Sequence, residues 1–353
     1  MWPDRRILDL LGIEHPIVQA PMAGAQGSAL AIAVSEAGGL GSLPCALLNL
    51  EQARNEMQII RQRTDKPFNV NFFCHQSPPI DEAREARWVE RLADYRQELG
   101  VERATVPGGR APFDEAMCAL VEEFAPRVVS FHFGLPETRL FDRVKAAGCV
   151  VIASATTVAE ARWLEARGVD AVIAQGAEAG GHRGMFLSEN IASQPGTFAL
   201  VPQVVDAVRL PVIAAGGVGD ARGLVAALVL GASAVQIGTA YLLTPESTIS
   251  PIYRAALKGA REDQTVLTNV FTGRPARAIV NRAVRELGPI SGEAPAFPNA
   301  ANAMLPLRMK AEAAGSGEFT SLWSGQAPGF AREVPAGELT RTLCAGALAM
   351  LRA

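Results

Sequence analysis

Short runs of apolar and β-branched residues recur along the first two thirds of the chain, each followed by a glycine or a polar break. The runs are too short for helices and too continuously apolar for strands with one solvated face. They therefore predict strands that are buried on both faces of a parallel sheet. Eight such runs begin at Pro16, Leu40, Phe68, Val128, Cys149, Asp170, Pro211 and Ala234.

Helical patterns separate these runs. The segments 28–38, 156–168 and 219–231 end at glycine and are rich in alanine and leucine, as helices between strands are. Eight strand–helix units over roughly 230 residues predict an α/β fold, a (β/α)8 TIM barrel. A doubly wound sheet is the alternative, but the first predicted strand leads into APMAGAQG, which lacks the GxGxxG spacing typical of that fold.

Two regions do not follow the repeat. Residues 77–125 form an insertion after the third strand that is longer than one crossover helix needs. Residues 244–353 contain the Pro/Gly-rich stretch PISGEAPAFPNA and helical patterns near 302–314 and 338–352. We expect a barrel over residues 1–243, with the insertion 77–125, and a C-terminal lid and helical extension over residues 244–353. We interpret the two regions as a lid and a C-terminal helical cap and not as an independent domain, because neither could bury much core alone.

Composition narrows the function classes. The net charge is −3 and no basic stripe is present, which argues against a nucleic-acid partner. No apolar run reaches about 18 residues, so no membrane span is expected, and the charged start MWPDRRILDLLGI does not resemble a signal peptide. Five cysteines at spacings that match no zinc or redox motif predict buried, reduced thiols in a cytoplasmic protein.

The active site of a TIM barrel forms at the C-terminal ends of its strands. Here those ends carry small or amide-bearing residues, without a group of carboxylates, and the four histidines are too dispersed to predict a metal site. Glycines in AAGGVGD and QIGTAY, after the seventh and eighth strands, predict a phosphate site; the alternative is that they only form tight turns. The amides of Asn71, Gln175 and Gln236 match the donors and acceptors of a flavin ring, although each alone also fits a core position.

His182 lies in QGAEAGGHRG, residues 175–184, directly after the sixth predicted strand. Glycines there let the backbone approach a ligand, and an imidazole can transfer a proton or bind an anion. The alternative is an exposed loop histidine. His132 either lines the same cavity or has a structural role, and His15 and His75 are expected to take no part in the chemistry.

The stretches QAPMAG, NVNFF, SFHFG, IASATT, QGAEAGGHRG, PVIAAGGV and QIGTAY resemble the nitronate monooxygenase family, once called 2-nitropropane dioxygenases. The resemblance runs from about Ile13 to Leu243 and continues more weakly through VFTGRPARA and SLWSGQ. It implies a TIM barrel with noncovalent FMN, His182 as the active-site histidine, and His132 and Tyr253 in the substrate cavity. Some members of the family have several tyrosines in the substrate cavity, whereas this whole chain has three tyrosines. Phe297 and Asn302 stand in the region where further cavity tyrosines would be expected. The residues it implies for FMN are Met22, Asn71, Gln175, Gly180, Gly217, Gly219, Gln236, Gly238 and Thr239.

The implied reaction is the oxidation of an alkyl nitronate, such as propionate 3-nitronate, with O2 to a carbonyl compound and nitrite. His182 would bind the nitronate oxygens or remove the α-proton of a neutral nitroalkane. One alternative is an NAD(P)H-dependent FMN reductase of quinones or enoyl thioesters, and another is a flavin- or phosphate-binding module without catalysis. We expect a small-molecule nitronate and O2 as partners, and no metal; a homodimer stays open.

Overall fold

Eight parallel strands form the centre of the computed structural model, which describes residues 2–107 and 110–352. Each of the eight predicted runs contains one of them. The strands are β1 (Ile17–Gln19), β2 (Gly41–Pro44), β3 (Phe68–Phe73), β4 (Val128–His132), β5 (Val150–Ala155), β6 (Ala171–Gln175), β8 (Val212–Ala215) and β9 (Ala234–Ile237). Their order is β1-β9-β8-β6-β5-β4-β3-β2, and a parallel bridge from Val18 to Leu40 joins the two outermost strands. The predicted TIM barrel is therefore confirmed.

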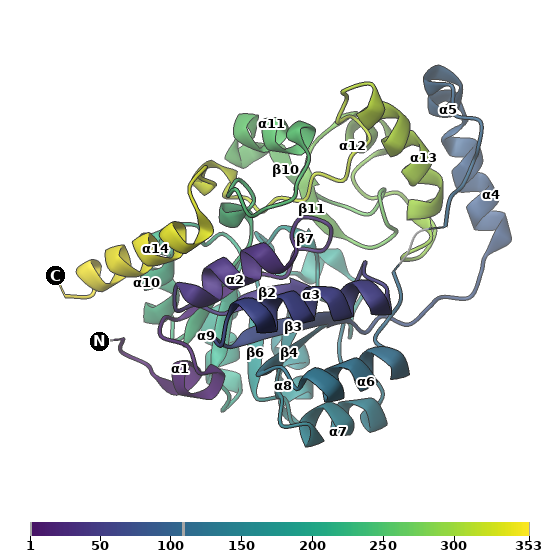
Figure 1. The fold of residues 1–353 in the computed structure, drawn as a ribbon. Helices are drawn as coiled ribbons and strands as arrows, with labels where there is room; N and C mark the ends of the chain where they lie inside the picture. Colours follow the sequence, from purple (N-terminus) through teal and green to yellow (C-terminus); the bar gives the residue numbers. More distant parts are fainter. Residues whose placement is uncertain (1, 108–109, 353) are drawn as a thin grey trace.

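Helices surround the barrel (Figure 1). The N-terminal α1 (Arg6–Leu11) precedes the first strand, and the helices at 28–38, 156–168 and 219–231 are confirmed as α2, α8 and α10, with ends that differ by up to three residues. The helices between successive strands are α2 (Ser28–Glu36), α3 (Leu50–Arg63), α6 (Glu115–Phe124), α7 (Thr138–Ala146), α8 (Val158–Glu165), α9 (Thr197–Ala207) and α10 (Ala221–Val229).

The last helix, α14 (Ala336–Met350), packs between α10 and α2 and so occupies the position of the eighth barrel helix (Figure 1). Its buried side chains Leu339, Leu343 and Ala347 belong to the barrel core. The sequence separates α14 from β9 by about a hundred residues, which is why its pattern predicted only a C-terminal extension. The division at residues 243 and 244 stays a prediction.

The insertion after β3 packs on the C-terminal part of the chain. Helices α4 (Glu82–Arg91) and α5 (Ala93–Leu99) lie beside α13 (Ala300–Ala313), away from the barrel strands (Figure 1). Trp88 is buried there, and its indole Nε1 donates to the carbonyl oxygen of Ala300 at 3.2 Å. These helices and α12 (Arg282–Leu287) form a second hydrophobic cluster apart from the barrel core.

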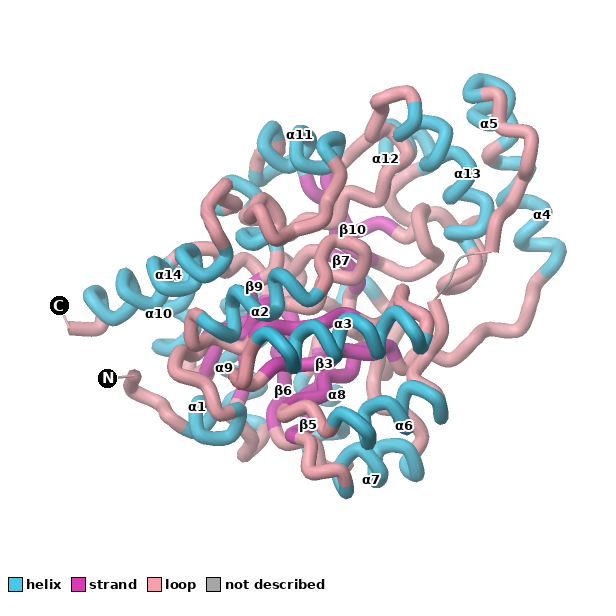
Figure 2. Tube along the Cα trace, viewed as in Figure 1, coloured by secondary structure: helices cyan, strands magenta, loops and turns pink. Residues whose placement is uncertain are grey.

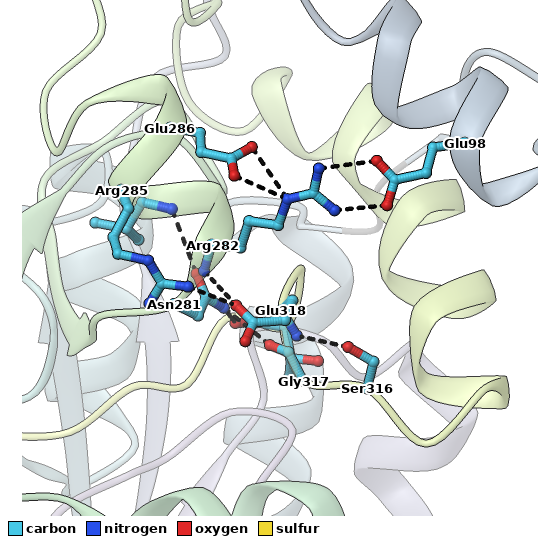
Figure 3. Close-up of polar contacts among 10 residues, drawn as sticks. Glu98, Asn281, Arg282, Arg285, Glu286, Ser316, Gly317 and Glu318 are labelled. Atoms are coloured by element: carbon cyan, nitrogen blue, oxygen red, sulfur yellow. Dashed lines mark hydrogen bonds and ion pairs between the residues drawn. The ribbon is translucent and has the colours of Figure 1, made fainter.

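Arg282 on α12 binds acidic side chains on α5 and on its own helix at the edge of this cluster (Figure 3). Its guanidinium binds both carboxylate oxygens of Glu98 on α5, at 2.6 and 2.8 Å, and its Nε lies 2.9 Å from an oxygen of Glu286. Nearby, Arg285 pairs with Glu318 at 3.3 Å. Partly exposed pairs of this kind stabilise by about 0.2–1 kcal/mol each, so the network orients the insertion more than it stabilises the fold.

A second, antiparallel sheet lies above the C-terminal ends of the barrel strands, and Figure 2 shows it as a separate magenta group. Its order is β10 (Thr265–Thr268), β11 (Ala276–Ile279) and β7 (Gly181–His182), and α11 (Pro251–Gly259) precedes β10 in the chain. Short 3-10 turns complete the chain at Ile191–Ser193, Thr239–Tyr241, Glu262–Gln264 and Pro328–Phe330. Across the described residues, every helix is too short or too polar to cross a bilayer.

Candidate active site

A cavity of about 350 Å³ lies at the C-terminal ends of the barrel strands. The strand ends and the loops that follow them form its floor, while β7, the loop at Trp323 and the insertion residue Arg110 contribute to its walls. This is the face on which TIM barrels carry their active sites. The cavity is therefore enclosed by segments that are far apart in the sequence.

The loops after β8 and β9 form one end of the cavity. Gly216 and Gly217 have φ angles of +119° and +73°, a backbone region that side chains disfavour. Within residues 2–107 and 110–352, no backbone carbonyl accepts from the N–H groups of Gly217 or Val218. A 3-10 turn begins at Thr239, directly after β9 and Gly238. This end of the cavity thus offers N–H donors to an anion.

Amide side chains lie along the floor. The Oε1 atom of Gln236 is buried and has no hydrogen-bond partner in the described part of the protein. An unpaired buried acceptor costs about 1–3 kcal/mol, so this position suits a ligand that donates a hydrogen bond. Asn71 is partly satisfied by the protein, because its Nδ2 donates to the Ser130 hydroxyl at 2.9 Å.

Gln175 binds the loop that follows it. Its Nε2 donates to the backbone oxygen of His182 at 3.0 Å, and its Oε1 accepts from the N–H of Gly184 at 2.7 Å. The side chain lines the cavity, but both of its polar ends already hold the backbone around the active-site histidine candidate.

His132, like Gln175, forms a hydrogen bond to the backbone oxygen of His182. Its Nε2 lies 3.1 Å from the backbone oxygen of His182, and its Nδ1 lies 3.0 Å from the hydroxyl of Ser154. Because a carbonyl oxygen only accepts, Nε2 carries the proton and the Ser154 hydroxyl donates to Nδ1. Burial lowers the pKa of His132 to about 3, so this imidazole is neutral and acts as a donor.

The ring of His182 forms part of the cavity wall. Its Nε2 lies 2.9 Å from the hydroxyl oxygen of Thr272, and its centroid lies 5.2 Å from those of both Phe297 and Trp323. Burial, reinforced by the positive charge of Arg110, holds the pKa of His182 well below its usual range. The imidazole is therefore neutral at pH 7 and can accept a proton.

Arginine side chains give this region a positive charge. Arg110 lines the cavity with its guanidinium 5.9 Å from the ring centroid of Phe297. Burial lowers the pKa of Arg110 to about 10, which leaves it charged at neutral pH. Arg274 lies behind the wall, 4.0 Å from the ring centroid of Phe133. Among the described residues, the charged group that acts on Arg110 is another cation, Arg308, and no carboxylate pairs with it, so this part of the cavity attracts anions.

The glycine-rich loop that carries His182 is fixed at both ends. The fully buried Arg183 donates to the backbone oxygens of Gly176 and Gln175 at 2.5 and 2.6 Å. The buried carboxylate of Glu160 accepts from the N–H groups of Phe186 and Leu187 at 2.6 and 3.1 Å. These contacts order the loop around the histidine.

Most of the residues predicted from the sequence line this one cavity: Met22, Asn71, His132, Gln175, Gly180, His182, Gly217, Gln236, Gly238, Thr239 and Tyr253. Gly219 instead faces Phe330, since a Cβ there would lie 2.7 Å from the Cβ of that residue. The hydroxyl of Tyr253 donates to the backbone oxygen of Trp323. The roles predicted for all of these residues stay predictions.

Other residues of the site were missed. Arg110, Thr272 and Trp323 come from the insertion and the C-terminal part, which the repeat pattern did not place over the barrel. The stretches VFTGRPARA and SLWSGQ contain Thr272 and Trp323 and were the available signal. His75, expected to be uninvolved, packs behind the wall with its ring centroid 4.8 Å from that of Phe297. Asn302 lies on α13, and its backbone oxygen accepts a hydrogen bond from the N–H of Val106 at 2.9 Å.

Comparison with known proteins agrees with this geometry. A family model described as nitronate monooxygenase matches residues 4–346. The chain belongs to the nitronate monooxygenase family. The resemblance stated from the sequence is thereby confirmed, and the protein is an enzyme, an oxidoreductase whose family oxidises nitronates. Enzymes of the nitronate monooxygenase family are flavoenzymes.

Individual relatives cover nearly the whole chain. A nitronate monooxygenase from Pseudomonas aeruginosa is 45% identical over 342 residues, which span 96% of this chain and 97% of that protein. A nitroalkane oxidase from Streptomyces ansochromogenes superposes with a TM-score of 0.90 at 40% identity, over 98% of this chain and 99% of that one. FabK from Thermotoga maritima superposes with a TM-score of 0.75 at 32% identity, over 98% and 97% of the two chains.

Proposed function

We propose that this enzyme oxidises alkyl nitronates, such as propionate 3-nitronate, with FMN and O2 to a carbonyl compound and nitrite. The observation that carries the proposal is that one cavity holds a neutral, partly buried His182 and the charge of Arg110, which no carboxylate of the described residues pairs. A nitronate is an anion, so it gains from the guanidinium. A neutral nitroalkane presents an acidic α-proton, which a neutral imidazole can accept.

The cavity fits FMN by the chemistry of its donors and acceptors. The unpaired Oε1 of Gln236 suits a ring N–H, and the free N–H groups of Gly217 and Val218 suit a phosphate. Bound FMN would supply the redox chemistry of the reaction. The residues proposed to hold it are Met22, Asn71, Gln175, Gly180, Gly217, Gln236, Gly238 and Thr239, which line the cavity, and Gly219, which follows Gly217 in the loop after β8.

The protein's own residues bind and orient the substrate. Arg110 and His182 would hold the nitro or nitronate oxygens, while the rings of Phe297 and Trp323 exclude water on the far side of the imidazole. His132 and Tyr253 contribute to the cavity wall. Their polar ends bind backbone oxygens, so their proposed contribution is to shape the substrate cavity.

The variant His182→Asn tests this role. We expect it to keep FMN bound but to lower turnover of a neutral nitroalkane by about 100-fold or more, since a general base contributes that much. The loss should be smaller with a preformed nitronate, which needs no proton removal. Nitrite release measured with both substrates decides the question, and an unchanged rate with both would remove His182 from the reaction.

A further inference from the structure

We infer that Thr272 is a positioning residue that fixes which nitrogen of His182 carries the proton. The inference rests on the proposed function, in which His182 faces the substrate. Thr272 would accept a hydrogen bond from Nε2–H and leave Nδ1 unprotonated, so that Nδ1 is the atom that takes the α-proton.

The contacts of the Thr272 hydroxyl set its direction. The hydroxyl oxygen lies 2.9 Å from His182 Nε2 and 3.4 Å from the backbone oxygen of Arg274. A hydroxyl has one proton, and the Arg274 carbonyl can only accept it. With its proton directed there, the Thr272 oxygen accepts from His182, and Nε2 must be the protonated nitrogen.

The side chains that surround His182 in the described part of the protein offer its N–H no alternative acceptor. The rings of Phe73, Phe133, Phe297 and Trp323 surround the imidazole. The charged and titratable groups that act on it are Arg110, Arg274, His132 and His75. The arginines are donors only, His132 donates to the His182 backbone, and His75 contacts Phe297. Among the described neighbours, Thr272 is therefore the acceptor that fits.

The backbone holds Thr272 and His182 in a fixed relationship. His182 on β7 pairs with Ala276 on β11, and the N–H of Arg183 donates to the oxygen of Pro275 at 2.9 Å. Gly273, between Thr272 and this strand, has a φ of +89°, and a Cβ there would lie 2.0 Å from the Pro295 oxygen. Only glycine fits this turn, so the position of the Thr272 hydroxyl is set by β11 and by the loop behind it.

The proton transfer balances without another partner. The substrate Cα–H bond breaks, an N–H bond forms at Nδ1, and the electron pair stays on the substrate as the nitronate. The imidazolium and the nitronate then have opposite charges and lie in one water-excluding cavity. Since a hydroxyl stabilises an imidazolium less than a carboxylate would, His182 can release the proton again afterwards.

The first test is direct and does not depend on turnover. Nitrogen-15 NMR of the FMN-loaded protein labelled at its four histidines reports the protonated nitrogen of each ring, and His182→Asn assigns the His182 signals. We expect Nε2–H alone in the wild type and in Thr272→Ser, and a mixture of tautomers in Thr272→Val. A wild-type signal from Nδ1–H, or the same tautomer in Thr272→Val, would overturn the inference.

The second test separates proton removal from substrate binding. Thr272→Val should lower kcat for a neutral nitroalkane by about 10- to 100-fold, part of the general-base contribution, with KM and the turnover of preformed nitronate within about twofold. Thr272→Ser should restore the rate. Equal losses with both substrates, or no loss, would contradict the inference. A wild-type enzyme that releases no nitrite from nitronates would contradict the proposed function instead, while the tautomer measurement would still decide the role of Thr272.

Discussion

The imidazole Nε2 of His132 donates a hydrogen bond to the backbone oxygen of His182 at 3.1 Å. The two histidines of the cavity therefore have different tasks. The carbonyl of His182 fixes the tautomer of His132, whose Nδ1 then accepts from the hydroxyl of Ser154. His182 presents its ring to the cavity. The position of His182 in its glycine-rich loop is fixed because His132 and Gln175 bind its backbone oxygen.

This arrangement predicts a loss of stability in acid. The folded pKa of His132, about 3, lies below the 6.5 of an unperturbed histidine, so the unfolded state binds more protons between these values and stability falls as the pH drops below about 6.5. At pH 5 the contribution of His132 should be about 2 kcal/mol less favourable than at pH 7. Urea unfolding at both pH values measures it.

The matched variant is His132→Asn, which does not titrate. Its free energy of unfolding should decrease about 2 kcal/mol less between pH 7 and pH 5 than that of the wild type. His15, His75 and His182, whose pKa values burial also lowers, remain in both proteins and add a common slope. Identical pH dependence of the two proteins would show that His132 is not buried in its neutral form.

Gln236 should contribute to FMN affinity. Gln236→Leu removes the buried acceptor that has no partner among the described residues, and we expect the Kd for FMN to rise about tenfold, the equivalent of one hydrogen bond. Flavin fluorescence during titration of the apoprotein measures the Kd. Gln203→Leu, at an exposed position on α9, is the control; an equal Kd for the wild type and Gln236→Leu would contradict the predicted contact.

Arg110 should affect substrate binding more than turnover. Arg110→Met keeps much of the apolar stem over Phe297 but removes the charge, so the KM for a nitronate should rise about tenfold or more while kcat changes less. Steady-state nitrite release gives both constants. Arg103→Met, at an exposed position of the same insertion, is the control. A fall in kcat at constant KM would show that Arg110 does not bind the anion in the ground state.

Local pattern was sufficient to predict the barrel. Strands that are buried on both faces have continuous apolar sequences, and each of the eight apolar runs contains a strand. The same pattern placed Gln175, Gln236 and His132 at strand ends, and since these ends meet on one face of a barrel, the residues were predicted to share a cavity.

The walls of the cavity could not be predicted in this way. β7 has two residues and exists because it pairs with β11, almost a hundred positions later. Thr272 and Arg110 reach His182 through tertiary packing, which leaves no periodic signal. The order of the loop QGAEAGGHRG could not be predicted either, because Arg183 and Glu160 hold it through contacts that composition does not reveal.

Nitrite release during aerobic turnover tests the central claim most directly. The FMN-loaded enzyme is mixed with propionate 3-nitronate while nitrite and O2 are followed, and NADPH is added to a parallel anaerobic sample while the flavin absorbance is recorded. We predict nitrite release together with O2 uptake, and slow bleaching of the flavin by NADPH. Rapid bleaching by NADPH without nitrite release from the nitronate would contradict the account and favour a reductase.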